Sequence, residues 1–372
     1  MQRNVSQSYV PEIDGLRAIA ILAVMLFHAA PQCFIGGFLG VEVFFVLSGF
    51  LITSLLLGEH DRLGRIDFRQ FYLRRCLRLL PALLVMLVLF VAAGFVCFDF
   101  RKALWLLKDA GLALSYCYNW VRAFEIRADG MMVHSWSLAI EEQFYLLWPP
   151  SLVWLMRRSD SRRTLSWMVL GLAAGFTLNR LLLILSGASL YRIYNGLDTR
   201  IDGILLGCAL AIGISSGVVN LRSATLQKGL RLALFPACAV LLTMFGTMSV
   251  FSAAPFIWGM PVVSLCTAIM VCSICSLENH WSQKFFGGRV LVWIGQRSYG
   301  LYLWHSPVHH FLAEFDIAPL IRISLGFAVA FIAATLSFAL VEKPLLLRFK
   351  HRLAPRPQAA PPVLVAVGQP AV

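Results

Sequence analysis

The sequence predicts an all-α, polytopic membrane protein with about ten transmembrane helices and both termini in the cytoplasm. Hydrophobic residues make up 59% of the 372 residues and charged residues only 14%, against about 25% charged in average soluble domains. The mean hydropathy of +0.75 leaves too little polar surface for a soluble globule of this size. Apolar runs of about the 20 residues that a bilayer requires recur along the whole chain.

The ten predicted spans are 13–31, 38–58, 77–97, 138–156, 165–186, 200–217, 231–249, 255–277, 292–312 and 319–341. Lys and Arg gather in alternate loops, and this bias assigns those loops and both chain ends to the cytoplasmic side. The net charge of +13 is therefore explained by membrane orientation, and no nucleic-acid partner is expected.

Residues 1–350 form one predicted transmembrane domain, and residues 351–372 form a Pro- and Ala-rich cytoplasmic tail that we expect to be disordered. Loop 98–137 is the longest outer segment, and its stretch 103–118 fits an interfacial or re-entrant helix. The nine cysteines show no CxxC or Cys/His metal spacing, so no metal site is predicted. One disulfide among Cys33, Cys97 and Cys117 stays open.

The first two spans carry the ionisable residues that lipid tolerates least. Arg17 and His28 are eleven residues apart, close to three helical turns and roughly 16 Å of helix rise, so they share one face. An ionisable residue inside a span is by default a functional-site hypothesis. A neutral His28 can take a proton from a hydroxyl, with Glu42 holding its tautomer. Arg17, near the cytoplasmic end of the same face, suits an anionic ligand. The structural alternatives are that His28 is a packed core residue and that Arg17 pairs with Asp14 at i,i+3.

Arginines open the third span at Arg74, Arg75 and Arg78. Arg75 and Arg78 lie at i and i+3, so two guanidinium forks share a face that suits a phosphate-bearing cosubstrate from the cytoplasm. The structural alternative, equally well supported by the sequence, is that these arginines only anchor the span at the cytoplasmic side of the membrane.

Two carboxylates, Glu141 and Glu142, stand at the outer start of the fourth span. A capping box with Ser137 as the N-cap is the structural alternative. Further polar residues at span ends, each of which alternatively satisfies a neighbouring helix, are Ser135, Ser137, Arg200, Asp202, Tyr299 and His305. These residues suit an enzyme, and they suit equally a proton-coupled transporter or a flippase of a lipid-linked glycan.

Six stretches, in order, resemble the acyltransferase-3 family of membrane O-acyltransferases: YVPEIDGLRAIAILAVMLFH, GVEVFFVLSGFLI, RRCLRLLP, SWSLAIEEQFYLLWP, TRIDGILLG and SYGLYLWHSPV. The resemblance covers about residues 9 to 345. It implies a bacterial multi-pass inner (plasma) membrane enzyme that O-acylates, most often O-acetylates, surface polysaccharides and related glycans.

The resemblance also implies roles for single residues. His28 matches the essential histidine and Arg17 its supporting residue, while Arg75 and Arg78 match a motif associated with the acyl-CoA donor. Glu141 matches a carboxylate motif, and Tyr299 and His305 match a late motif. We therefore expect His28, oriented by Glu42 or Glu141, to deprotonate the sugar hydroxyl, with Glu142 as a further catalytic candidate. Acetyl-CoA or another acyl-CoA is then a cosubstrate and no cofactor is bound permanently. O-antigen, exopolysaccharide and a lipochitooligosaccharide all fit as acceptors. A covalent acyl-His28 route, a homo-oligomer and a separate extracytoplasmic partner stay open.

Overall fold

The structure is a computed structural model that describes residues 9–127 and 129–353. All of its regular elements in these ranges are helices, which confirms the predicted all-α class. Residues 354–372 of the predicted tail lie outside the described residues, and the last helix, α16, ends at Leu353. The nine cysteines are free, Cys33, Cys97 and Cys117 included.

The first half of the described chain contains the elements α1 (Pro11–Ala29), η1 (Gly37–Leu39), α2 (Gly40–Leu63), α3 (Phe68–Cys97), α4 (Phe100–Leu114), α5 (Tyr118–Ala123), α6 (Ser135–Arg158), α7 (Arg162–Leu185) and α8 (Leu190–Asn195). The second half contains α9 (Leu197–Ser215), α10 (Ala224–Thr247), η2 (Pro255–Gly259), α11 (Met260–Ser276), α12 (Trp281–Phe286), α13 (Arg289–Gln296), α14 (Ser298–Leu312), α15 (Pro319–Ser337), η3 (Phe338–Glu342) and α16 (Lys343–Leu353).

Short polar side chains start several of these helices. A Ser or Asp side chain at the N-cap accepts a hydrogen bond from a backbone N–H that the helix itself leaves unpaired. The caps of this kind include Asp67, Asp99, Ser161, Ser189 and Ser223. The capping box considered for Ser137 is not formed, because α6 begins at Ser135 and its N-cap is His134.

Six helical segments among the described residues are long and apolar enough to cross a membrane: Gly37–Leu63, Phe68–Cys97, Arg162–Leu185, Ala224–Thr247, Pro255–Ser276 and Pro319–Phe349. Only 17% of the apolar window in Arg162–Leu185 and 22% of that in Pro319–Phe349 is buried, against 72% in Gly37–Leu63. Such extensive exposed apolar surface suits lipid and not water. The chain is therefore a helical membrane protein, while ten spans and the side on which the termini lie stay predictions.

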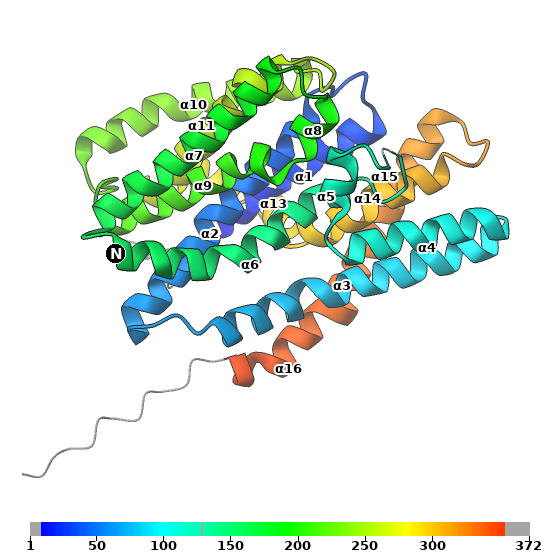
Figure 1. The fold of residues 1–372 in the computed structure, drawn as a ribbon, viewed down its shortest axis with the longest axis horizontal. Coiled ribbons are helices and arrows are strands. Elements are labelled where there is room, and N and C mark those ends of the chain that lie inside the picture. Colours follow the sequence, from blue (N-terminus) through cyan, green and yellow to red (C-terminus); the bar gives the residue numbers. More distant parts are fainter. Residues whose placement is uncertain (1–8, 128, 354–372) are drawn as a thin grey trace, which may run out of the picture.

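The remaining predicted spans fall on α1, α6, α9 and the pair α13 and α14. Predicted span 292–312 is not one helix, because α13 ends at Gln296 and α14 starts at Ser298. The stretch predicted as interfacial or re-entrant lies mainly in α4, which runs beside α3 at one edge of the bundle (Figure 1).

The interior of the bundle holds α1, α2 and α9, and α7, α10 and α11 lie on the opposite side from α3 and α4 (Figure 1). Helices α2 and α9 touch through glycines. A Cβ atom on Gly49 would lie 1.9 Å from the carbonyl oxygen of Ile204, and one on Gly207 would lie 2.1 Å from that of Val46. Small residues let helix backbones approach closely in membranes, and this contact fixes the position of α2 beside the site described below.

Candidate active site

Two cavities lie along α1 and α2. The first, here the arginine cavity, has a volume of about 300 Å³ and is lined by residues that include Arg17, Arg75, Arg78, Glu141, Glu142 and Tyr145. The second, here the histidine cavity, has a volume of about 430 Å³ and is lined by residues that include His28, Arg122, His134, Trp136, Tyr191 and Tyr194.

The two cavities share part of their walls. Val41 of α2 and Tyr302 of α14 line both of them. Arg17 faces the arginine cavity and His28 faces the histidine cavity, so α1 runs alongside both. Val41 and Tyr302 therefore stand between the arginine cavity and the histidine cavity.

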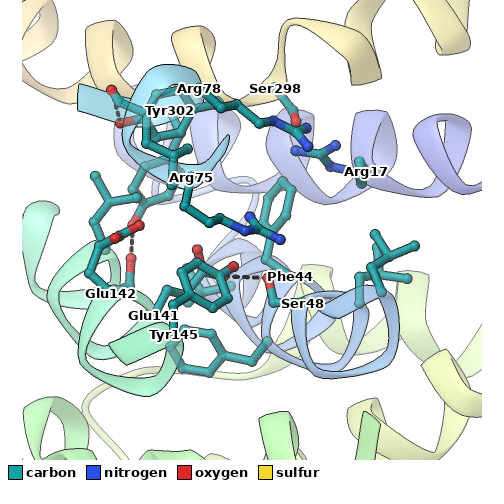
Figure 2. A pocket seen from close by; sticks show the side chains of 18 of the residues that line it. Arg17, Phe44, Ser48, Arg75, Arg78, Glu141, Glu142, Tyr145, Ser298 and Tyr302 are labelled. Atoms are coloured by element: carbon teal, nitrogen blue, oxygen red, sulfur yellow. Dashed lines mark hydrogen bonds between the residues drawn. The ribbon is translucent and has the colours of Figure 1, made fainter. Parts of the chain in front are cut away.

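The arginine cavity gathers positive charge from two helices. The guanidinium groups of Arg17, Arg75 and Arg78 point into the same space (Figure 2). The guanidinium of Arg75 stacks 4.5 Å from the ring centre of Tyr145, a contact that fixes its plane. Arg17 also lies 3.5 Å from the carboxylate of Asp14, so the pairing considered as its alternative is present as well.

Arg74, the third arginine of the motif, does not line this cavity. Its guanidinium pairs with Glu59 on α2 at 3.1 Å. Because Arg74 and Arg75 are adjacent, they project from different sides of α3. Only Arg75 and Arg78 of this motif reach the cavity.

Both carboxylates of α6 belong to the arginine cavity. The hydroxyl of Ser48 donates a hydrogen bond to Glu141 at 2.8 Å. Glu142 lies across the cavity from Ser48 in Figure 2. Neither carboxylate lines the histidine cavity, so the structure does not bring Glu141 to His28, where it was expected as an alternative to Glu42.

The ring of His28 is oriented by its own helix. Its Nδ1 lies 2.9 Å from the carbonyl oxygen of Val24. A carbonyl oxygen only accepts hydrogen bonds, so Nδ1–H donates and Nε2 of the neutral ring keeps its lone pair. The tautomer that a general base requires is therefore set by Val24 and not by Glu42.

Two further imidazoles stand beside His28. The ring centre of His305 lies 4.9 Å from that of His28 and 5.6 Å from that of His134. Nδ1 of His305 contacts the carbonyl oxygen of Tyr302 at 2.9 Å, which leaves Nε2 of that ring as the acceptor nitrogen. The cluster therefore presents acceptor nitrogens on His28 and His305.

His134 was not singled out from the sequence, although it directly precedes Ser135. Its side chain is 2% exposed and lines the histidine cavity. Neither of its ring nitrogens has hydrogen-bond geometry with any residue in the part of the chain that the structure describes. Buried polar groups are normally hydrogen-bonded, so His134 is ready to contact a bound molecule. Sequence spacing offers no signal for this role, since His134 lies at a helix start and not in a periodic pattern.

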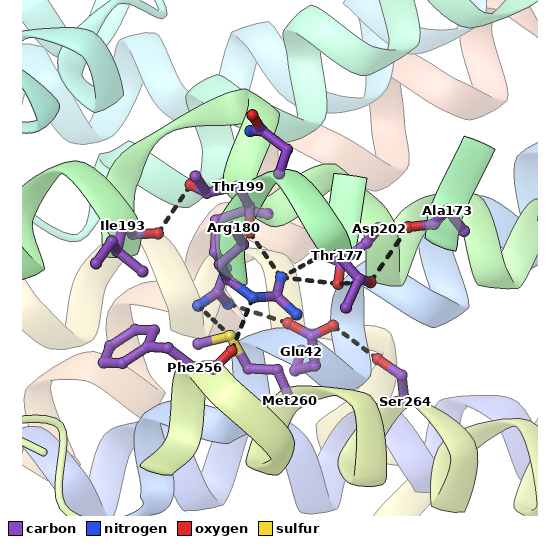
Figure 3. Close-up of polar contacts among 12 residues, drawn as sticks. Glu42, Ala173, Thr177, Arg180, Ile193, Thr199, Asp202, Phe256, Met260 and Ser264 are labelled. Carbon is purple, nitrogen blue, oxygen red and sulfur yellow. Dashed lines mark hydrogen bonds and ion pairs between the residues drawn. The ribbon is translucent and has the colours of Figure 1, made fainter. Parts of the chain in front are cut away.

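Glu42 and Arg200 form a buried ion pair away from His28. Their oxygen and nitrogen are 3.1 Å apart, and the side chains are 1% and 0% exposed. Ser264 donates a second hydrogen bond to Glu42 at 2.7 Å. The neighbouring pair of Arg180 and Asp202, at 2.7 Å, completes a network that joins α2, α7, α9 and α11 (Figure 3).

This network reaches the histidine cavity through its wall. The guanidinium of Arg200 lies 5.3 Å from the ring centre of Trp136 and 5.4 Å from that of Tyr194. Both rings line the histidine cavity. Arg200 and its partner Glu42 line neither cavity, so they support the aromatic wall from the side that faces away from the cavity.

Of the remaining sequence candidates, Ser137 contacts Tyr302. The hydroxyl of Tyr302 donates to the carbonyl oxygen of His134 at 3.0 Å and meets the hydroxyl of Ser137 at 2.5 Å. The hydroxyl of Tyr299 donates to the carbonyl oxygen of Leu79 at 2.9 Å. Ser135 is buried and lines neither cavity. These contacts fix Tyr302 at the wall between the two cavities.

Metal ligands are not gathered at this site. Within residues 9–127 and 129–353, no group of three or more His, Cys, Asp or Glu side chains is arranged to hold a metal ion.

Comparison with known families decides the kind of protein. A family model described as an acyltransferase domain, acyltransferase 3, matches residues 10–342. The chain belongs to this acyltransferase family. The resemblance found in the sequence motifs is thereby confirmed, and so, at the level of the family, is the expected enzyme class.

Several curated relatives carry related names. The peptidoglycan O-acetyltransferase OatA of Listeria monocytogenes serovar 1/2a is 36% identical over 357 residues, which cover 91% of this chain and 56% of the relative. The O-acetyltransferase OatA of Staphylococcus aureus strain NCTC 8325 is 32% identical over 355 residues, covering 93% of this chain and 58% of the relative. The chain thus spans a little over half the length of these relatives. No solved structure matches it.

Proposed function

We propose that this acyltransferase moves an acetyl group from acetyl-CoA to a hydroxyl of a cell-surface or secreted glycan, across a bacterial plasma membrane. The observation that carries the proposal is the pair of cavities that share Val41 and Tyr302. One cavity is equipped for a phosphorylated donor and the other for proton transfer. A transferase that works across a bilayer needs both, joined by a narrow passage.

The donor binds at the arginine cavity. Arg75 and Arg78 provide planar guanidinium forks, which bind phosphate oxygens in pairs. This cavity then opens to the cytoplasm, where acyl-CoA is made. The flexible arm of the donor passes Val41 and Tyr302 and covers the roughly 16 Å of helix rise between Arg17 and His28.

The chemistry takes place at His28. Its Nε2 removes the proton from the acceptor hydroxyl while the hydroxyl oxygen attacks the thioester carbonyl carbon. The new C–O bond forms, the C–S bond breaks, and the CoA thiolate leaves and takes the proton back from His28. His134 stands in the same cavity, and the N–H of its neutral ring donates to the carbonyl oxygen as negative charge develops there.

The acceptor occupies the histidine cavity. Its walls include Trp136, Tyr191 and Tyr194, broad apolar faces that suit the ring of a sugar, and a few polar groups that fix orientation. The names of the relatives, one of them a peptidoglycan O-acetyltransferase, support a glycan acceptor.

The test uses membrane vesicles from cells that produce the chain, with labelled acetyl-CoA and a glycan acceptor. His28→Gln should lower the transfer rate by about 10²-fold or more, the range for loss of a general base. His309→Gln is the matched control, because His309 is on α14 and lines neither cavity. Unchanged transfer by His28→Gln would refute the role of His28.

Two other outcomes would replace parts of the mechanism. Acetyl-His28 that accumulates when the acceptor is left out would show a covalent route in place of general-base catalysis. Gradient-dependent glycan movement without any acetyl transfer would identify a transporter and overturn the proposed function.

A further inference from the structure

Arg122, on the short helix α5, is the residue of the histidine cavity that the mechanism leaves unexplained. It lines the cavity, and its guanidinium lies 5.8 Å from the ring centre of Tyr191, another lining residue. Its one hydrogen bond to a described residue is a long contact of 3.5 Å from Nη1 to the carbonyl oxygen of Val133. Its Nε is buried and has no hydrogen-bond partner among the described residues.

Other arginines in this part of the molecule have carboxylate partners. These pairs are Arg127 with Asp109 at 2.9 Å, Arg192 with Asp198 at 2.6 Å, Arg200 with Glu42 at 3.1 Å and Arg180 with Asp202 at 2.7 Å. No ion pair of Arg122 occurs within the ranges that the structure describes. Each of these neighbouring arginines therefore has a negatively charged partner, whereas the guanidinium of Arg122 has none among the described residues.

The cavity itself offers Arg122 no negative charge. None of the residues that line it is Asp or Glu; its charged and ionisable members, apart from the tyrosines, are Arg122 and the imidazoles of His28, His134 and His310. A half-buried guanidinium without a negatively charged partner loses hydration and gains no compensating charge. A bound anion provides that contact through two parallel N–H···O bonds.

We propose that Arg122 binds an anionic group of the acceptor, so that the preferred acceptor is an acidic and not a neutral glycan. The inference rests on the proposed function, because it assigns the acceptor to the histidine cavity. The ring of Tyr191 packs against one face of the guanidinium, and the N–H groups of the guanidinium donate hydrogen bonds to the carboxylate or phosphate oxygens of the acceptor. Arg122 thereby fixes which hydroxyl of the sugar faces His28, which makes it a specificity residue and not a catalytic one.

Two sources share this anion chemistry: the carboxylate of an acidic sugar and the phosphate of a phosphorylated or lipid-linked saccharide. The experiment compares oligosaccharides of equal length that are neutral, carboxylated or phosphorylated. The protein is held in nanodiscs of one zwitterionic lipid, so that lipid charge does not vary. The variants are Arg122→Gln, which removes the charge, and Arg122→Lys, which keeps the charge without the fork. Arg101→Gln, an exposed position on α4 outside both cavities, is the control.

Binding is measured first, without acetyl-CoA, so that the result does not depend on turnover. The wild type should bind one of the two anionic oligosaccharides at least tenfold more tightly than the neutral one. Arg122→Gln should lose about 10- to 150-fold of that affinity, the range for a hydrogen bond to a charged group. Arg122→Lys should lose less of this affinity, and Arg101→Gln should lose none. The affinity for the neutral oligosaccharide should be the same in all variants. Whichever anionic oligosaccharide responds identifies the source of the charge.

Turnover separates this inference from the proposed function. In the transfer assay, Arg122→Gln should lower kcat/KM for the anionic acceptor by a similar factor and leave the KM for acetyl-CoA unchanged. Equal binding of neutral and anionic oligosaccharides by the wild type, or wild-type anion binding by Arg122→Gln, overturns the role of Arg122. Selective anion binding without acetyl transfer by the wild type leaves that role intact and overturns the proposed function instead.

Discussion

Removing the carboxylate of Glu42 should destabilise the protein and leave the chemical step largely intact. Glu42 and Arg200 are 1% and 0% exposed, so Glu42→Ala leaves a guanidinium buried without its counter-charge. Breaking a buried ion pair by removing one partner costs about 3–5 kcal/mol. The loss of the Ser264 hydrogen bond adds to this cost, because its hydroxyl becomes a buried donor without an acceptor.

The assay measures both stability and activity for each variant. Unfolding midpoints are recorded in one detergent, and transfer rates are expressed per folded molecule. The double variant Glu42→Met with Arg200→Met should recover most of the loss, because replacing both charges removes the unpaired cation. Asp61→Ala is the control: the side chains of Asp61 and its partner Arg162 are 51% and 28% exposed, and ion pairs near the surface contribute about 0–1 kcal/mol. If Glu42→Ala kept its unfolding midpoint but lost transfer, Glu42 would act in the chemistry and the assignment above would be wrong.

Three further outcomes follow from the two cavities. In initial-rate assays, Arg75→Lys should raise the KM for acetyl-CoA by about tenfold or more, because the guanidinium fork is lost. Arg74 lies outside the cavity, so Arg74→Lys should leave this KM unchanged, and equal effects of the two variants would contradict the assignment of Arg75, and not Arg74, to the donor site. His134→Phe should lower kcat by about 10²-fold if its N–H stabilises the oxyanion, with acceptor binding retained; unchanged kcat would remove it from the mechanism. Val41→Trp should fill the space between the two cavities and so block transfer, while equilibrium binding of acetyl-CoA persists. Val41→Ala, the control, should stay active, and a wild-type transfer rate for Val41→Trp would show that the acetyl group takes another path.

Local patterns in the sequence indicated much of what the structure contains. Hydropathy located the long helices because burial in lipid or protein selects long apolar runs. The spacing of Arg17 and His28 put both on one side of α1, and the structure gives each a cavity along that helix. The i,i+3 spacing of Arg75 and Arg78 predicted that both share one face of the helix, and in the structure both line the arginine cavity.

Contacts between distant parts of the chain were not predictable from spacing. Glu42 lies close to His28 in sequence, yet its partner Arg200 is on α9, and Glu141 meets Ser48 on α2. Helix packing, set by close contacts such as that at Gly207, decides these pairings, and no local pattern encodes them. Span 292–312 was expected as one helix because hydropathy averages over the break between Gln296 and Ser298.

His134 and Arg122 were missed for a related reason. They stand at a helix start and on a six-residue helix within the long loop 98–137, where apolar periodicity carries no information. Their significance comes from what surrounds them, namely a shared cavity and the absence of hydrogen-bond partners for the ring nitrogens of His134 and for Nε of Arg122 within the described ranges. Such a property belongs to the folded chain and not to its sequence pattern.

The most direct test is a structure of the protein with a non-reactive acetyl-CoA analogue bound. The account predicts phosphates on Arg75 and Arg78, the arm of the analogue between Val41 and Tyr302, and its acetyl carbon in the histidine cavity. There a bound acceptor oxygen, hydrogen-bonded to Nε2 of His28, should lie about 3–3.5 Å from that carbon. An analogue that stays wholly within the arginine cavity, with Tyr302 closed between its acetyl group and His28, would contradict it.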